Sequence, residues 1–175
     1  MAAGAAQQQL ELAFQRIQVD ADTHEPPARR RVRHGEKLME YMVGITLALF
    51  LCAAAAGLCM DRERVFYPAV TIAVASYYLA FAVVDGRNEV MLSEVLIASL
   101  FIVAAVAGFK RSPWFAVVAL GGHGVMDAFH HHLVHNNGVP RVWPGFCMTF
   151  DVTAALIVTW VMLARARQAR SRGQG

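Results

Sequence analysis

Charged side chains are scarce in this chain, since Asp, Glu, Lys and Arg make up only 17% of its 175 residues. Between residues 41 and 164 they are reduced to short interruptions between long apolar runs. A soluble domain is nearer half apolar, whereas 57% of this sequence is hydrophobic. The scarcity of charge excludes an ordinary soluble domain and predicts a multi-pass integral membrane protein that contacts the lipid bilayer.

Cysteine is also rare, with three residues in the whole chain: Cys52, Cys59 and Cys147. All three lie in apolar segments, which excludes a disulfide framework of the kind found in small secreted domains. We interpret Cys52 and Cys59 as small packing residues.

Signals for nucleic-acid binding and for export are missing as well. The net charge of +3 comes from basic residues beside the apolar runs, where they set topology and contact lipid headgroups. No RNA or DNA motif accompanies them, so we expect no nucleic-acid partner. We expect no cleaved signal peptide, because the basic cluster at residues 29–33 begins late and the apolar run after it is long enough to span.

Five apolar segments, each close to the ~20 residues that cross a bilayer core, fill the rest of the chain. They are Tyr41–Met60, Val65–Val84, Val90–Phe109, Pro113–Val134 and Val142–Ala164. The predicted fold class is therefore all-α, an integral membrane bundle of five transmembrane helices. We place this domain at residues 39–166, between a polar N-terminal arm (1–38) and a basic C-terminal tail (167–175).

Two features of this arrangement stay open. Within the arm, the spacing of Leu10, Phe14 and Ile17 suits a short amphipathic helix over residues 7–19, and a disordered tail fits equally well. We call the side of the membrane that holds the N-terminus side A and the other side B. Basic residues divide seven to eight between the two sides, so the positive-inside rule decides no orientation.

Residues 122–135 depart most from this apolar pattern, since they hold Asp127 and five of the seven histidines. At about 100° per residue, His123, Asp127, His130 and His131 share one face of a helix. His132 points to the opposite side, and His135 lies at the helix end. Glycines at 121, 122 and 124 allow a neighbouring helix to approach closely.

The neighbouring segments carry one buried acid each, Glu94 and Asp151. Counted from the connecting turns, at a constant rise per residue, both fall level with Asp127. Ionisable residues at membrane depth are costly and are usually functional. We therefore expect the acids and histidines of the third, fourth and fifth segments to meet in one layer nearer side A.

Histidine and carboxylate side chains at helical spacing are the ligands that first-row metals prefer. The proposed metal ligands are His123, Asp127, His130, His131, Glu94 and Asp151. Asp127, Asp151 and Glu94 are also the candidate catalytic residues, because an acid not bound to the metal can orient a histidine or act as a base. Cys147, His135 and Tyr78 are further possible contributors, although packing is the better interpretation of Cys147 and interfacial anchoring the usual role of Tyr78. The loop at residues 136–144 is either a lid or a plain turn.

The motif His123-Gly124-x-x-Asp127-x-x-His130-His131, followed by Pro140 and Pro144-x-x-Cys147-x-x-x-Asp151, resembles a family of small bacterial and fungal multi-pass membrane proteins of unknown function. The resemblance covers roughly residues 40–165 and implies no established chemistry. The shorter piece from His123 to His130 also looks like a motif of the bacterial membrane carotene dioxygenases, which use a His-bound iron. Those enzymes are longer and have more spans, so this local resemblance implies no substrate.

The sequence thus predicts a membrane enzyme with iron, or alternatively zinc, as its cofactor. Iron implies oxidation of a lipid-soluble small-molecule substrate, and zinc implies hydrolysis through a metal-activated water. Two other classes stay open: a small transporter or binding protein for divalent metal or protons, and a structural subunit with a buried polar network. The apolar side-B halves of the segments show no second gate, which disfavours the transporter.

Overall fold

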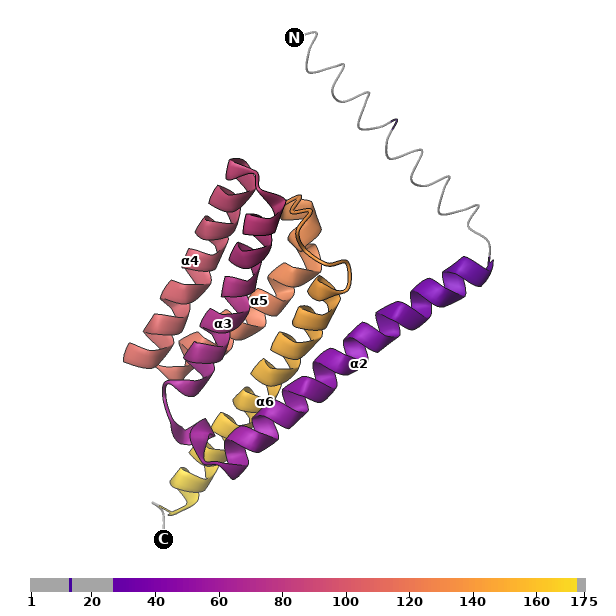
Figure 1. The fold of residues 1–175 in the computed structure, drawn as a ribbon. Helices are drawn as coiled ribbons and strands as arrows, with labels where there is room; N and C mark the ends of the chain where they lie inside the picture. The colour runs from indigo at the N-terminus through magenta and orange to yellow at the C-terminus, as the bar shows by residue number, and fades with distance from the viewer. Residues whose placement is uncertain (1–12, 14–26, 173–175) are drawn as a thin grey trace. The chain divides into compact units, whose positions relative to one another are not determined.

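The computed structural model describes residue 13 and residues 27–172 of the chain, and the described residues are helices and short connections without a β-strand (Figure 1). The chain divides into two compact units, residues 1–37 and residues 38–175, which are described here separately. Apart from Ala13, the amphipathic helix predicted over residues 7–19 lies outside the described residues. The predicted all-α class is confirmed for the described part of the chain.

Five α-helices and one short 3-10 helix make up the described fold. They are α2 (Pro27–Gly57), η1 (Met60–Arg62), α3 (Phe66–Asp85), α4 (Asn88–Lys110), α5 (Pro113–Leu133) and α6 (Trp143–Arg172).

The two outer helices are longer than the apolar segments predicted. α2 begins at Pro27 rather than near Tyr41, because arginine, lysine and glutamate are good helix formers and proline suits a first helical turn. It ends at Gly57, and Cys59 turns the chain with a left-handed φ of 59°, so Met60 belongs to η1. α6 continues to Arg172, so residues 167–172 of the predicted tail are helical.

Glycine and proline set two of the ends of the inner helices. α3 is closed by Gly86, whose φ of 79° lies in the left-handed region that favours glycine. α5 starts with Pro113, a residue whose fixed φ suits the first helical turn. These short connections make α3, α4 and α5 antiparallel neighbours.

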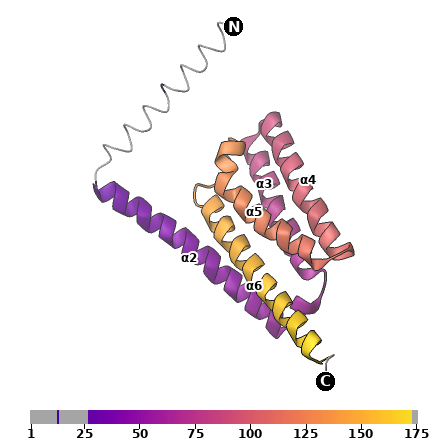
Figure 2. The same cartoon turned by 180° about the vertical axis from the view of Figure 1, so that it is seen from behind.

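Within residues 38–175, α4 packs against α3 and α5, and α5 packs against α6 (Figures 1 and 2). One buried cluster joins four helices, from α2 to α6: Ala48, Cys52, Val74, Leu120, Phe150 and Ala154. This cluster lies between the two ends of the bundle.

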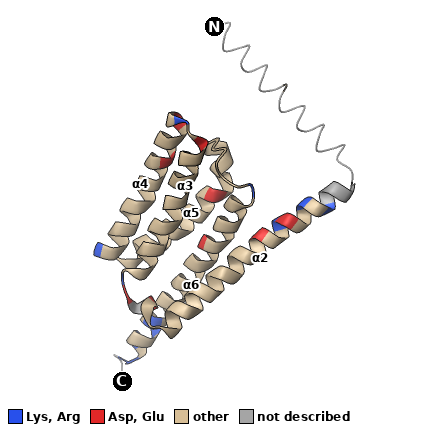
Figure 3. Ribbon diagram, in the orientation of Figure 1, with Lys and Arg blue, Asp and Glu red and all other residues tan. Residues whose placement is uncertain are grey.

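The outer surface of the bundle is apolar, the reverse of a soluble protein. On α4, Leu92, Leu96, Leu100 and Val103 form a stripe in which each side chain is at least 62% exposed. Lys and Arg lie mainly at helix ends, while acidic residues interrupt α5 and α6 (Figure 3). An exposed apolar surface of this kind must be shielded from water, and long apolar helices suit a lipid bilayer.

Four helices among the described residues are long and apolar enough to cross a membrane, consistent with a multi-pass membrane protein. They are α2 from Arg31 onward, α3, α4 and α6. α5 has 21 residues but is not among them, because its histidines and Asp127 lower its mean hydropathy. A fifth span therefore stays a prediction.

Candidate metal centre

Three side chains from α5 and α6 form the centre of the candidate site. His123 and Asp127 are one turn apart on α5, and Asp151 faces them from α6. The three residues are 0–1% exposed. The Nδ1 of His123 lies 2.8 Å from Asp151 Oδ2, to which it donates a hydrogen bond, and 3.3 Å from Asp127 Oδ2. We call His123, Asp127 and Asp151 the metal group, because a ligand atom from each lies within 4.8 Å of the other two.

Gly124 explains how α6 comes close enough to α5 for this contact. A Cβ atom at this position would lie 2.9 Å from the Cβ of Asp151 and 3.0 Å from the backbone oxygen of Met148. Gly122, two residues earlier, has room for a Cβ, whose nearest neighbour would be a Phe101 ring atom at 3.7 Å. Of these two positions, only residue 124 requires glycine for the site to form.

The metal group carries more negative charge than the protein around it neutralises. Both carboxylate oxygens of Asp127 and the Oδ1 of Asp151 are buried and have no hydrogen-bond partner among the described residues. Burying a carboxylate without a partner is costly, so native proteins pair such groups or place them on a cation. The group therefore has the donor atoms and the uncompensated charge that a divalent metal would satisfy.

A second buried pair lies beside the metal group. His130 on α5 donates from its Nε2 to Glu94 Oε1 on α4 at 2.9 Å. The same oxygen accepts a 2.9 Å hydrogen bond from Nδ2 of Asn136, in the loop between α5 and α6. Glu94 and His130 are 0% and 2% exposed. We call Glu94 and His130 the side-A pair, since their hydrogen-bonded neighbour Asn136 belongs to the loop on side A.

Aromatic rings connect the two sets. The Tyr78 ring lies 4.2 Å from the His130 ring and 5.9 Å from the His123 ring, measured between centroids. Its buried hydroxyl has no hydrogen-bond partner by distance and angle among the described residues. Phe101 packs edge-on against His123 at 4.9 Å. Tyr78 thus lies between the sets as a member of the site, not as an exposed anchor at the membrane surface.

The structure groups the predicted ligands differently from a single layer in two respects. Glu94 and His130 bind each other and lie outside the metal group. His131 is exposed, and its ring stacks on His132 with centroids 3.9 Å apart. The helical wheel placed His131 at the edge of the shared face, about 80° from His123, and at that angle the side chain leaves the interior.

The remaining candidates divide between buried and exposed positions. Cys147 is 1% exposed and lies near Asp127 and Asp151, but it is not a member of the metal group. His135 is exposed, and it contributes its backbone oxygen, which accepts a hydrogen bond from Arg87.

The loop after α5 is fastened over the side-A end of the bundle. Asp85 accepts a 2.7 Å hydrogen bond from the Asn137 backbone and forms a 2.7 Å ion pair with Arg87. This contact raises the pKa of the Arg87 guanidinium, because the carboxylate of Asp85 stabilises the charged form. Gly138 lies against Phe81, where a Cβ would come within 2.1 Å of the Phe81 backbone oxygen. We call these contacts the loop latch.

Sequence reasoning missed two participants, Asn136 and Phe101. The Asn-Asn-Gly turn indicated a loop, but no spacing rule connects a loop amide to Glu94, 42 residues away. Phe101 lies in an apolar run, where nothing in the composition distinguishes it from its neighbours as a site residue. Both contacts are products of how α4 packs against α5.

No family model, curated protein or solved structure matches the chain. The resemblances that the His123 motif suggested therefore stay predictions, and function is inferred from the residues of the site.

Proposed function

We propose that this protein is an integral membrane metalloenzyme whose divalent metal is bound by His123, Asp127 and Asp151. One observation carries the proposal: three buried ligand atoms converge from two helices while three carboxylate oxygens around them lack a partner. On binding the metal, His123 Nδ1 would give up the proton that it donates to Asp151, and its separations of 2.8 and 3.3 Å from the two carboxylate oxygens are close to those of adjacent ligands around a metal with bonds of about 2.1 Å.

The proposal includes α5 as a fifth span. α5 is as long as α3, and it packs between α4 and α6, both apolar enough to cross a membrane. His123, Asp127 and His130 are buried, and the exposed His131 and His132 lie only in the last turn, while Val118, Val125 and Phe129 are each at least 56% exposed. A helix that buries its ionisable groups and exposes apolar ones suits lipid despite its lower hydropathy.

Iron is the metal that we propose first. The metal group offers one imidazole and two carboxylates, and it includes no thiolate. A set of imidazole and carboxylate donors with open positions suits non-haem iron. Zinc is the second choice. A bound iron would support oxidation of a lipid-soluble substrate by O2, and a bound zinc would support its hydrolysis.

The other site residues act around the metal in this proposal. Glu94 orients His130, and the loop latch excludes water from side A. Tyr78 and Phe101 fix the histidine rings by packing. Substrate would approach from the apolar surface of the bundle.

Metal analysis of the purified protein tests the proposal. We expect wild type in detergent to contain close to one iron or zinc per chain, and Asp127→Asn and His123→Ala to lose it. His131→Ala is the matched control, since it removes an exposed histidine from the same helix and should retain the metal. A correctly folded wild type that binds neither metal after reconstitution with Fe²⁺ or Zn²⁺ would refute the proposal and favour a structural polar network.

A divalent-metal transporter is the second candidate, and one observation favours it. The buried polar residues continue from the metal group past Tyr78 to Glu94 and then to Asn136 in a loop. Such a row resembles the start of an ion path from side A. Uptake of Fe²⁺ or Zn²⁺ into sealed vesicles that depends on Glu94 would favour transport, and metal retention without uptake would favour the enzyme.

A further inference from the structure

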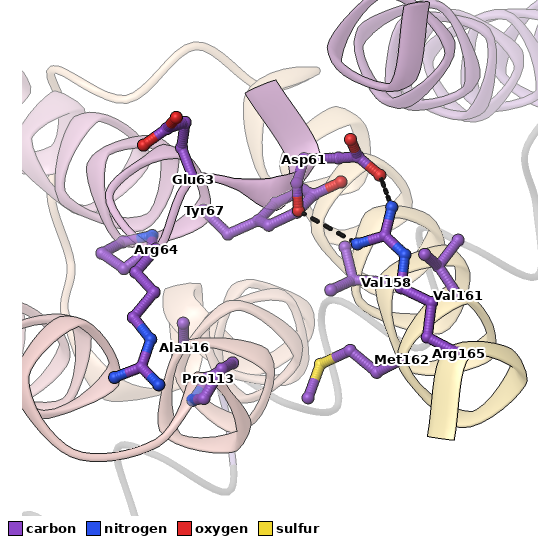
Figure 4. A pocket seen from close by; sticks show the side chains of 11 residues that line it. Asp61, Glu63, Arg64, Tyr67, Pro113, Ala116, Val158, Val161, Met162 and Arg165 are labelled. Atoms are coloured by element: carbon purple, nitrogen blue, oxygen red, sulfur yellow. Dashed lines mark hydrogen bonds and ion pairs between the residues drawn. The ribbon is translucent and has the colours of Figure 1, made fainter. Parts of the chain in front are cut away.

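A cavity of about 190 Å³ lies at the side-B end of the bundle, away from the metal group. It is formed where η1 and the start of α3 meet the first turn of α5 and the last part of α6 (Figure 4). Pro68, Ala116, Val158 and Met162 line it with apolar surface. The buried cluster of Ala48, Leu120 and Phe150 belongs to the middle of the bundle, between this cavity and the metal group.

Two arginines flank the cavity, and they differ in their partners. Arg165 forms an ion pair with Asp61 and a 3.5 Å hydrogen bond to its backbone oxygen. Arg64 is exposed and has no ion pair with any described residue. Its side chain extends toward Pro113, while the neighbouring Glu63 points away from it (Figure 4). The cavity thus has one cation whose charge is compensated and one whose charge is available.

The position of the cavity suits the boundary between lipid tails and headgroups. α3 and α5 both begin beside it, at Phe66 and Pro113, and the apolar helices run from there toward side A. A phospholipid at this level would have its phosphate beside the arginines and its first methylene groups against the apolar lining. Arginine is suited to this contact, because its planar guanidinium donates two parallel hydrogen bonds to a phosphate.

We propose that this cavity binds one anionic glycerophospholipid. Arg64 contacts the headgroup phosphate, and the upper part of an acyl chain enters the apolar cavity. A volume of about 190 Å³ holds the beginning of a chain but not its whole length, so the rest of the lipid lies along the outer surface of the bundle. Basic pockets between transmembrane helices recognise anionic headgroups in this way.

Native mass spectrometry of the detergent-purified protein measures this binding directly. We expect wild type to retain phosphatidylglycerol more strongly than phosphatidylcholine of the same chain length. Arg64→Gln should weaken phosphatidylglycerol binding about fivefold and weaken phosphatidylcholine binding less, because the choline cation already neutralises the phosphate of phosphatidylcholine. Arg170→Gln is the matched control: it removes the same charge from α6 outside the cavity lining and should have no effect.

Two further experiments test whether the ligand is a lipid or a free phosphate, and whether it binds in the cavity or on the surface. Inorganic phosphate should not compete with phosphatidylglycerol, since it cannot use the apolar lining. Val161→Phe narrows the cavity and should weaken phosphatidylglycerol binding, because the beginning of the acyl chain no longer fits. Equal losses in Arg64→Gln and Arg170→Gln, or competition by inorganic phosphate at similar concentration, would overturn the proposal. Arg64 is exposed, so its substitution leaves folding intact, and an unchanged melting temperature checks this.

Discussion

Asp127 is the residue that most constrains what this protein does. It is 0% exposed, and neither of its carboxylate oxygens has a hydrogen-bond partner among the described residues. His123 Nδ1 is 3.3 Å away but directs its hydrogen bond to Asp151. A buried carboxylate in this position needs more positive charge beside it, because an uncompensated charge is costly to bury.

Replacing Asp127 with asparagine distinguishes a metal ligand from a structural residue. In chelator-treated protein, Asp127→Asn should raise the melting temperature, by a stability gain on the order of 1 kcal/mol, because two buried carboxylates share the single His123 imidazole and the substitution removes one of these charges. In the presence of excess metal the order should reverse, because only wild type gains stability from binding. Thermal unfolding followed by tryptophan fluorescence measures both states.

Glu89→Gln provides the control for this reversal, since Glu89 is an exposed acid on α4 whose side chain is 80% exposed. Its melting temperature should match wild type in both conditions. An Asp127→Asn protein that is less stable than wild type even without metal would contradict the predicted role, since it would show that the carboxylate already has a stabilising partner.

At the scale of elements, the contact between α5 and α6 decides whether the metal group forms. Gly124→Ala should push α6 away from α5, because the new Cβ would meet Asp151 and the Met148 backbone below normal contact distance. We expect a loss of stability of about 1–3 kcal/mol and a lower metal affinity. Gly122→Ala adds the same methyl group to the same helix where there is room, and it should leave both unchanged. Metal titration and thermal unfolding compare the pair, and equal effects would contradict this account.

The loop latch should control access to the site from side A. Asp85→Asn weakens the ion pair with Arg87 and the hydrogen bond to the Asn137 backbone. We expect faster hydrogen exchange at the Asn137 amide and faster removal of bound metal by a hydrophilic chelator. Glu89→Gln is again the control, as Glu89 lies 3.9 Å from Arg87 without fastening the loop. Unchanged exchange in Asp85→Asn would show that Asn136 and Gly138 hold the loop without help.

At the scale of the whole molecule, the main question is how many times the chain crosses the membrane. Four helices qualify by length and apolar composition, and α5 does not. Five crossings place the two termini on opposite sides of the membrane, and four place them on the same side. We expect opposite sides, because α5 packs between two apolar helices and exposes apolar side chains.

Epitope tags at the two ends decide between these topologies. In sealed vesicles of one orientation, an added protease should remove one tag and leave the other until detergent opens the membrane. Simultaneous removal or protection of both tags would refute the fifth span. Cysteine labelling of an Asn137→Cys variant, in the loop between α5 and α6, gives an independent check, because that loop lies on side A only if α5 crosses the membrane.

The sequence alone determined the helical class, the positions of the inner helices and the ionisable residues of the candidate site. Apolar runs of bilayer length require helices, and an ionisable residue inside such a run is conspicuous. The spacing of His123, Asp127 and His130 also fixed their shared face, because helical periodicity is a local property. Counting residues from the connecting turns also predicted that Glu94 and Asp151 lie at the same depth, because the rise per residue of a helix is constant.

Only the tertiary structure decided which of these residues contact one another. Helical periodicity fixes angles along one helix, but rotation and separation between helices depend on packing at residues such as Gly124. Packing divided the expected layer into a metal group and a side-A pair, and it turned His131 outward. Asn136 joined the site because the loop folds back over α4. These contacts arise from steric fit between distant segments, which no spacing along a single segment encodes.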